Sequence, residues 1–382
     1  MSLEAPKKKI VFLTGTRADY GKIKSIMIAI EKSNLFELFV FITGMHMHAQ
    51  YGETYREVIK DGYKNTFLYI NQRAGMGADM DMTLANTISG FSAYASEIEP
   101  NMIVVHGDRI EALAVTIVGA MKNMLVAHIE GGEVSGTIDE SIRHAITKLA
   151  HIHFVANEES KKRILQLGER EDRVHVIGSP DIDIMQSPNL PSLDDAKLRY
   201  EIPFDNFYIG MFHPVTTSYE KMASYAKAFV DAIIASGKNF ILIHPNNDIG
   251  REFIVEEFAR LSDYAKCRTF LSIRFEYFLT LLKHSQCIVG NSSAGIREAP
   301  IYGVPSIDIG NRQQNRYRLG KSIFHCSYDS EEIYRAINNI PNHRLETSSI
   351  FGTGQSTEQF MKIIQKDTLW TMSLQKYFID KD

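Results

Sequence analysis

Short apolar runs alternate with amphipathic segments along the whole chain. Continuous apolar runs predict buried strands at residues 10–14, 38–43, 102–105, 125–127, 152–156 and 174–177 and, in the second half, at 208–212, 240–243, 287–289 and 306–309. Apolar positions at helical spacing predict helices at residues 82–97, 112–122, 142–149, 219–235 and 356–366. This alternation predicts the α/β class, with doubly wound parallel sheets.

The alternation is interrupted at residues 187–203, which contain three prolines and several polar residues. With 382 residues, the chain also exceeds the size at which a single hydrophobic core stops growing. The pattern therefore predicts a first domain at residues 7–186, a linker at 187–203, a second domain at 204–354 and a terminal helical segment at 355–382.

The composition argues against several classes of partner. A net charge of −4 without long blocks of like charge disfavours nucleic acid, whose binding proteins carry basic patches. No apolar run is long enough to span a membrane, and the run after the lysines at 7–9 is a core strand rather than a signal peptide. Three cysteines without CxxC spacing predict neither disulfides nor a zinc site, which fits a reducing cytoplasm.

Two loops of the first half concentrate charged residues. Residues 106–111 (HGDRIE) and 128–144 each follow an apolar run, and open α/β sheets bind their ligands at the carboxyl ends of strands. If Asp108, Glu130 and Asp139 lie close together, mutual repulsion can separate their pKa values and give one base and one acid. For Asp139 a structural interpretation stays open, because acids favour the first turn of a helix.

Other loops have the composition of anion contacts. Residues 15–21 (GTRADYG) lead from a strand into a helix, where backbone N–H groups and Arg17 can bind phosphate, although an ordinary turn fits equally well. Ser292 and Ser293 precede a short helix, which suits a diphosphate. Residues 310–316 carry arginines that either contact an anion or lie in a solvated loop.

Two histidines, His46 and His48, follow the second predicted strand at alternate positions. They could share a face and bind a metal ion, but no carboxylate or cysteine nearby completes a site. We therefore interpret them as loop residues that line a cleft, and we predict no metal site.

Several motifs follow one another in order across nearly the whole chain: 15–21 (GTRADYG), 43–46 (TGMH), 106–112 (HGDRIEA), 128–133 (HIEGGE), 212–217 (FHPVTT), 291–300 (NSSAGIREAP) and 310–313 (GNRQ). Together they resemble the hydrolysing UDP-N-acetylglucosamine 2-epimerases of bacterial sialic acid biosynthesis. The resemblance implies a GT-B fold, in which two Rossmann-like domains flank an interdomain active-site cleft and a C-terminal helix crosses back to the first domain.

The resemblance also implies a reaction and its residues. UDP-N-acetylglucosamine and water give N-acetylmannosamine and UDP, by anti elimination of UDP to 2-acetamidoglucal and hydration with inversion at C2. No metal or other cofactor is implied, and relatives form dimers or tetramers. The positions that match catalytic residues are Asp108, Glu130, Asp139 and His213. Those that match substrate contacts are Arg17, Ser292, Ser293 and Glu298 on the nucleotide side, with Glu298 on the ribose, and His46 and Arg143 on the sugar side.

Residues 131–136 (GGEVSG) and 139–143 (DESIR) depart from the non-hydrolysing epimerases, which favours release of free sugar. Three alternatives stay open. The substrate can be a UDP-2,4-diacetamido-2,4,6-trideoxyhexose of legionaminic acid synthesis, the chain can be a GT-B glycosyltransferase that needs an acceptor, or it can be a silent UDP-sugar-binding protein, which the intact set of acids disfavours.

Overall fold

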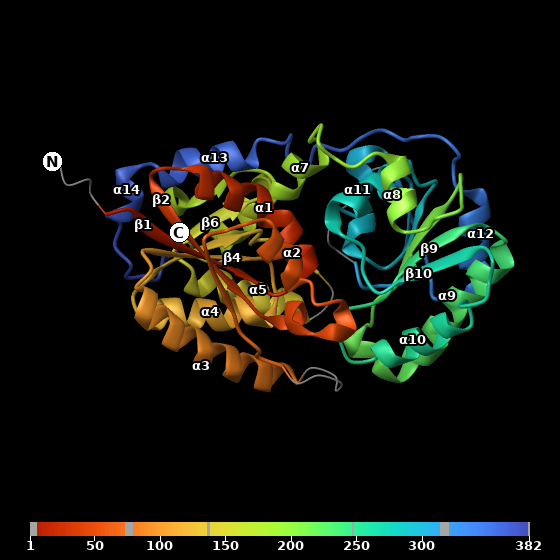
Figure 1. Cartoon of the computed structure of the whole chain (residues 1–382), viewed down its shortest axis with the longest axis horizontal. Coiled ribbons are helices and arrows are strands. Elements are labelled where there is room, and N and C mark those ends of the chain that lie inside the picture. Colours follow the sequence, from red (N-terminus) through yellow and green to blue (C-terminus); the bar gives the residue numbers. More distant parts are fainter. Residues whose placement is uncertain (1–5, 73–78, 136–137, 247, 314–320, 381–382) are drawn as a thin grey trace. The chain divides into compact units, whose positions relative to one another are not determined.

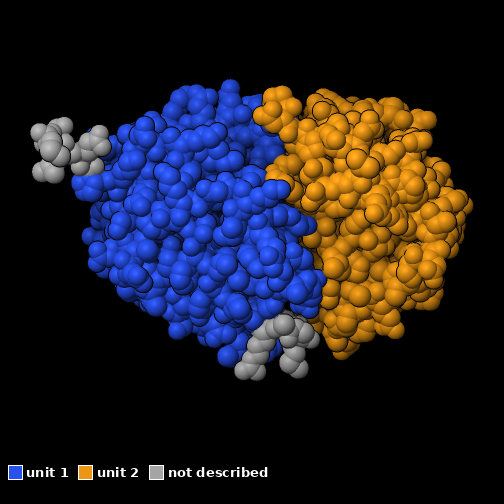
Figure 2. Space-filling model, in the orientation of Figure 1, with its two compact units in different colours: residues 1–133, 138–187, 350–382 blue, residues 134–137, 188–349 orange. Residues whose placement is uncertain are grey.

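The computed structural model describes residues 6–72, 79–135, 138–246, 248–313 and 321–380. The chain forms two compact units (Figures 1 and 2). Unit 1 comprises Met1–Glu133, Ile138–Ser187 and Ile350–Asp382, and unit 2 comprises Val134–Thr137 and Pro188–Ser349. Each unit is built on one parallel sheet between helices, which confirms the predicted GT-B-like class of two Rossmann-like units.

The sheet of unit 1 has the order β3-β2-β1-β4-β5-β6-β7. Its strands are β1 (Lys8–Thr14), β2 (Phe36–Ile42), β3 (Asn65–Leu68), β4 (Met102–His106), β5 (Leu125–Ile129), β6 (Ile152–Val155) and β7 (Val174–Val176). Its helices are α1 (Arg17–Lys32), α2 (Tyr55–Lys60), α3 (Met80–Ile98), α4 (Ile110–Met121), α5 (Ile138–Leu149), α6 (Glu158–Gln166), α7 (Pro180–Met185), α13 (Ser356–Ile364) and α14 (Asp367–Trp370), with 3-10 turns η1 (Gly44–Met47), η2 (Ala49–Tyr51) and η3 (Glu171–Arg173).

Alternate residues of the strands supply two cores in unit 1, one on each face of the sheet. Ile10 and Phe12 point into the core under α1, and Val11 and Leu13 point into the core under α3, α4 and α5. The returning chain joins the first core, where the Phe360 ring of α13 lies 4.5 Å from that of Phe154. Figure 1 shows α13, in blue, beside α1.

Unit 2 repeats the design with the order β10-β9-β8-β11-β12-β13. Its strands are β8 (Tyr208–Met211), β9 (Phe240–Ile243), β10 (Cys267–Phe270), β11 (Ile288–Gly290), β12 (Ser306–Ile309) and β13 (Ile323–Cys326). Its helices are α8 (Leu193–Arg199), α9 (Met222–Ser236), α10 (Arg251–Ala259), α11 (Phe275–His284) and α12 (Ser330–Asn339), with 3-10 turns η4 (Thr216–Lys221), η5 (Ser293–Gly295) and η6 (Ala299–Tyr302).

The segment 187–203, predicted as a linker, contains the helix α8. The Ser192 side chain begins this helix, because it accepts a hydrogen bond from the Asp195 backbone N–H. Within the described residues, no helix is both long and apolar enough to cross a membrane.

Candidate functional site

The strand order of each sheet defines where its loops can gather polar groups. In unit 1 the order reverses between β1 and β4, and ligands of open α/β sheets bind at such a switch point. Asp108 lies just after β4 and Glu130 follows β5 directly. The register pairs His106 with Ile129, so the two carboxylates leave neighbouring strands at the same edge of the sheet.

The Asp108 carboxylate is paired with a buried guanidinium. Arg143 of α5 is 1% exposed, and its Nη2 forms an ion pair with Asp108 Oδ2. Arg143 Nη1 donates to the Glu133 carbonyl at 3.0 Å, which fixes the direction of the guanidinium. A positive charge is thus held beside Asp108, in a geometry that a planar arginine provides and a lysine does not.

Glu130 is held by two buried neighbours. The Ser179 hydroxyl donates to Glu130 Oε1, and His106 Nε2 lies 3.2 Å from Glu130 Oε2. The backbone of Glu130 has φ +64°, a conformation that is uncommon for a residue other than glycine and occurs often at functional sites. The surroundings therefore impose both the backbone and the side-chain direction of this carboxylate.

Asp139 lies in the first turn of α5, four residues before Arg143, so both side chains emerge from the same face of this helix. Its side chain is half-buried. The position fits the structural interpretation, since an acid favours the amino end of a helix. On this face of α5 the Asp139 side chain lies one helical turn from Arg143, which forms the ion pair with Asp108.

His46, predicted to line the sugar side, is fully buried with both ring nitrogens hydrogen-bonded. The Thr14 hydroxyl donates to Asp19 Oδ1 at 2.7 Å, so it must accept from His46 Nε2 at 2.9 Å. Nδ1 then accepts from the Thr54 hydroxyl at 2.6 Å. Burial lowers the pKa of His46 to about 4, which keeps the ring neutral. The ring connects the loops after β1 and β2.

Arg17 and its turn are already occupied by internal partners. Arg17 Nε donates to Glu57 of α2 at 3.1 Å, and Nη2 makes a second contact with the same carboxylate. The backbone N–H groups of Gly15 and Thr16 donate to the Asp19 carboxylate at 2.9 and 3.1 Å. A phosphate at these amides would have to displace Asp19, so their geometry favours the structural interpretation of the turn.

Two buried residues that lie in the quoted motifs, His128 and Glu111, were not predicted as site residues. His128 Nε2 lies 2.8 Å from the Gly107 carbonyl, and burial lowers the pKa of His128 to about 3, so a neutral ring supports the turn that carries Asp108. Glu111 is completely buried and accepts from Gln72 Nε2 at 2.8 Å. A Cβ at Gly44, whose φ is +62°, would come within 2.7 Å of the Glu111 carboxylate, so only glycine fits there.

In unit 2 the strand order reverses between β8 and β11, and Asn291 joins the two loops at this switch point. Its side chain accepts from the His213 backbone N–H at 2.7 Å and donates to the His213 carbonyl at 2.9 Å. The Asn291 carbonyl accepts from Arg312 at 3.2 Å and from Gln313 at 2.8 Å. Gly290 before it has φ +144°, and a Cβ there would lie 1.9 Å from the Met211 carbonyl oxygen. Residues 314–316 of the predicted arginine-bearing loop lie outside the described residues.

The His213 ring has a defined tautomer. Its Nδ1 accepts from the Asn246 backbone N–H at 3.2 Å, so the proton of the neutral ring is on Nε2. Burial and the positive charge of Arg312 lower the pKa of His213 to about 3. At neutral pH this residue can therefore donate one hydrogen bond from Nε2, but it carries no positive charge.

The other predicted residues of unit 2 lie on the segment that leads from β11 through η5 to η6. Ser292 precedes η5, and its hydroxyl accepts from the Ala294 backbone N–H at 3.3 Å. Ser293 begins η5, and its carbonyl accepts from Arg297 N–H at 2.9 Å. Glu298, three residues beyond η5 and directly before η6, is 4% exposed, and its backbone N–H donates to the Ala294 carbonyl at 3.2 Å. The structure thus places Ser292, Ser293 and Glu298 with His213 at the switch point of unit 2. In unit 1 it places Asp108 and Glu130 at neighbouring strand ends, with Arg143 of α5 paired with Asp108 and Asp139 four residues before Arg143.

Ser179 was missed although the sequence contains a signal for it. It belongs to the segment Gly178-Ser179-Pro180, which directly follows a predicted parallel strand, as the other site loops do. Which neighbour its hydroxyl meets depends on the order of β5, β6 and β7, and no local pattern encodes that order.

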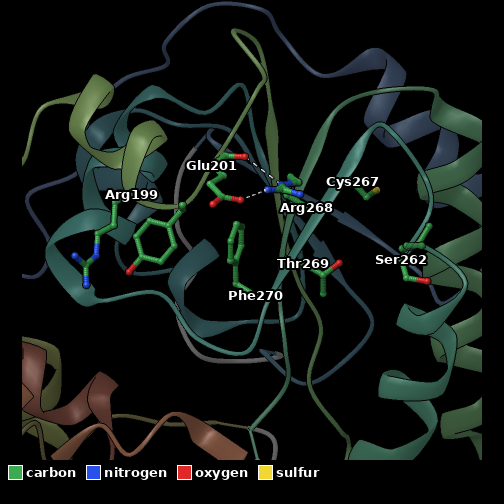
Figure 3. A pocket seen from close by; sticks show the side chains of 9 residues that line it. Arg199, Glu201, Ser262, Cys267, Arg268, Thr269 and Phe270 are labelled. Atoms are coloured by element: carbon green, nitrogen blue, oxygen red, sulfur yellow. Dashed lines mark hydrogen bonds and ion pairs between the residues drawn. The ribbon is translucent and has the colours of Figure 1, made fainter. Parts of the chain in front are cut away.

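A separate pocket of about 440 Å³ in unit 2 shares no residue with these sets (Figure 3). It lies beside the edge strand β10, and its Arg268 donates to the Glu201 carbonyl and carboxylate, both at 3.1 Å. The charge of this arginine is thus already paired with Glu201.

Known proteins with similar sequences and structures agree with the fold. The sequence profile of the UDP-N-acetylglucosamine 2-epimerase family matches residues 28–365. A protein of Neisseria meningitidis serogroup B named UDP-N-acetylglucosamine 2-epimerase is 50% identical over 98% of this chain and 99% of its own length. A Legionella pneumophila protein named UDP-N,N'-diacetylbacillosamine 2-epimerase (hydrolyzing) is 30% identical over 97% of this chain and 98% of its own.

Among solved structures, the Methanocaldococcus jannaschii UDP-GlcNAc 2-epimerase in complex with UDP-GlcNAc and UDP has a TM-score of 0.79. The match covers 94% of this chain and 99% of that protein at 20% identity, and so supports the fold. The length of the profile match and the identity to the Neisseria protein establish the family. The chain belongs to the UDP-N-acetylglucosamine 2-epimerase family.

Proposed function

We propose that the protein is a hydrolysing UDP-N-acetylglucosamine 2-epimerase, which converts UDP-N-acetylglucosamine and water to N-acetylmannosamine and UDP. The observation that carries the proposal is the pair of carboxylates on neighbouring strand ends, with Asp108 fixed by Arg143 and Glu130 by Ser179 and His106. The name of the Neisseria relative supports the substrate, and the name of the Legionella relative supports hydrolysis.

The reaction needs proton transfer on both faces of the sugar. A base removes the C2 proton, the electron pair forms a C1–C2 double bond, and the C1–O bond to UDP breaks. Water then adds its oxygen at C1, and a proton reaches C2 from the opposite face. Inversion at C2 is served by two acid–base groups, and we assign this work to Asp108, Glu130 and Asp139 without separating their roles.

Departure of UDP needs stabilisation of negative charge on the diphosphate. We assign this to the switch point of unit 2, where Ser292 and Ser293 offer hydroxyls and His213 offers Nε2–H as a neutral donor. Because its pKa is about 3, His213 acts by hydrogen bonding rather than as a proton donor at neutral pH. Glu298 is proposed for the ribose, and Arg17 and His46, whose polar groups bind Glu57, Thr14 and Thr54, are proposed to act by fixing their loops.

The test is a comparison of two substrates with purified protein. With UDP-N-acetylglucosamine we expect free N-acetylmannosamine and one equivalent of UDP, without an acceptor. A clear preference in kcat/KM for the UDP-2,4-diacetamido-2,4,6-trideoxyhexose would replace this substrate with the second candidate, which the Legionella relative favours. Turnover only when a sugar acceptor is added would replace the epimerase with a glycosyltransferase. A cytoplasmic homo-oligomer stays a prediction.

A further inference from the structure

The residue that binds Glu130 is itself fixed by the chain returning from unit 2. Ser179 is completely buried, its hydroxyl donates to Glu130 Oε1, and its backbone N–H donates to the Phe351 carbonyl at 2.6 Å. Phe351 is the second residue of the segment Ile350–Asp382, which returns to unit 1. One residue therefore joins a carboxylate of the proposed site to the segment that enters unit 1 from unit 2.

The backbones around this contact are packed too tightly for side chains. A Cβ added at Gly352 would lie 2.9 Å from the Cα of Gly178. A Cβ added at Gly178 would lie 3.2 Å from the Phe351 carbonyl oxygen and 2.9 Å from the Ser356 hydroxyl. Two glycines with positive φ, +82° and +113°, thus let the returning chain lie directly against the residue before Ser179.

A carboxylate of α7 holds the returning chain from the other side. Asp183 Oδ1 accepts from the Ser356 backbone N–H at 3.0 Å, and Oδ2 accepts from the Thr357 N–H at 2.7 Å. These are the first amides of α13, where an acidic acceptor is favourable. We call residues 178–187 and 350–357, which make these contacts, the return clamp.

The return clamp lies where the chain leaves unit 1 for the long segment Pro188–Ser349 and where it comes back. The chain leaves unit 1 after Ser187, two residues beyond the end of α7, and comes back at Ile350. The connecting segments reach α7 and Phe351 within two residues of these points. The Phe351 carbonyl accepts from the Ser179 backbone N–H, and α7 begins at Pro180, the residue after Ser179.

We propose that Ser179 is a positioning residue for Glu130, and that the return clamp holds Ser179 in place for this task. The proposal rests on the proposed function, because it concerns the orientation of a carboxylate in that reaction. Ser179 orders Glu130 Oε1, while His106 is close to the other oxygen.

The experiment is a double-mutant cycle on the UDP-sugar that the wild type turns over. Ser179→Ala is expected to lower kcat about 10-fold, the size of a lost hydrogen bond to a charged group, with KM within about 2-fold. In a Glu130→Gln background the same change is expected to have no further effect, because the carboxylate it orders is gone. Ser179→Cys, which keeps the size but donates weakly, should fall between serine and alanine.

Ser356→Ala is the matched control. It removes a hydroxyl that is buried in the same clamp but has no hydrogen-bond partner among the described residues, and it should keep wild-type kcat. Asp183→Ala loosens the clamp and is expected to lower kcat several-fold in the wild type and not in Ser179→Ala. Circular dichroism and thermal unfolding verify that each variant is folded.

Two results would overturn the proposal while leaving the proposed function intact. One is wild-type kcat in folded Ser179→Ala, and the other is an equal loss from Ser179→Ala in the wild-type and Glu130→Gln backgrounds. Full additivity of Asp183→Ala with Ser179→Ala would remove the return clamp from the account. A wild-type protein without turnover on either UDP-sugar would overturn both proposals.

Discussion

The two units hold their functional residues in different ways. In unit 1 each carboxylate depends on charged or polar side chains from another element, as Asp108 depends on Arg143 and Glu130 on Ser179 and His106. In unit 2 one side chain, Asn291, joins two loops largely through backbone groups. Backbone scaffolding suits the binding of a diphosphate, whereas paired side chains suit proton transfer. Substitutions in the two units should therefore change different kinetic constants.

Acid should affect the two units unequally, and this is the largest expected effect. In unit 1 burial lowers the pKa of His46 to about 4, of His128 to about 3 and of His151 to about 4. In unit 2 burial lowers the pKa of His213 to about 3. These rings stay neutral when folded but take up protons when unfolded, below about pH 6.5. Stability present above that pH is therefore lost as the pH falls toward 4, by about 2 kcal/mol per histidine at pH 5.

Hydrogen exchange and urea unfolding at pH 7 and pH 5 measure this loss. The amides of β1, β4 and β5 should lose more protection at pH 5 than those of β8, β9 and β11. Equal losses in both sheets, or a flat urea midpoint, would contradict the contrast between the units.

The second largest effect concerns the acids of unit 1. Asp108→Asn or Glu130→Gln should lower kcat at least about 100-fold, equivalent to about 3 kcal/mol, because each removes a group for proton transfer. The affinity for UDP, measured by calorimetry, should stay similar. Glu140→Gln serves as control, since Glu140 lies in the same turn as Asp139 but faces His144 at 3.5 Å. Unchanged turnover in either variant would remove that residue from the mechanism.

The third effect is the opposite change in unit 2. Asn291→Ala should weaken UDP binding about 10-fold, or about 1.4 kcal/mol, and lower kcat less, because the loops of His213 and Ser292 lose their common partner. Asn239→Ala, which removes an exposed hydrogen bond to the Asn206 carbonyl, is the matched control. A large fall in kcat with unchanged UDP affinity would mean that unit 2 does more than bind.

The smallest expected effect concerns an ion pair of unit 1 that we expect to stabilise the fold without contributing to catalysis. Lys376 of the C-terminal segment lies 2.6 Å from Glu169, which is also bound by Lys148 and lies 3.2 Å from His153. Lys376→Met should lower the free energy of unfolding by about 1 kcal/mol, since Glu169 keeps its other partners. Lys362→Met, at an exposed pair with Glu358, should change it by less than about 0.5 kcal/mol. A change in kcat for Lys376→Met would argue against a purely structural role.

The central strands and the edge strand β7 could be predicted from the sequence, whereas the other three edge strands could not. Strands β1, β4 and β5 are buried on both faces, so their sequences are continuous apolar runs. The edge strands β3, β10 and β13 contain polar residues such as Asn65, Arg268 and His325, and lack that signal. Helix α8 was hidden within the predicted linker because it is short and largely polar, with Ala196 as its one buried residue.

The candidate site shows the same division. Asp108, Glu130, His213 and Ser292 could be found because each follows a predicted strand, and parallel strands end at one edge. The contacts of these residues could not be predicted, since the pairing of Arg143 with Asp108 and the roles of Ser179 and Asn291 depend on the order of the strands and the direction of buried side chains. Arg17 is a further example, because the sequence of the loop 15–21 does not predict its pairing with Glu57.

Proton NMR of the purified protein with UDP-N-acetylglucosamine in D2O, without added metal or acceptor, tests the central claim most directly. The account predicts free N-acetylmannosamine with deuterium at C2, together with UDP, because the C2–H bond is broken and the new proton comes from solvent. Free sugar that keeps its C2 proton, or an unchanged spectrum, would contradict hydrolytic epimerisation of this substrate by the carboxylates of unit 1.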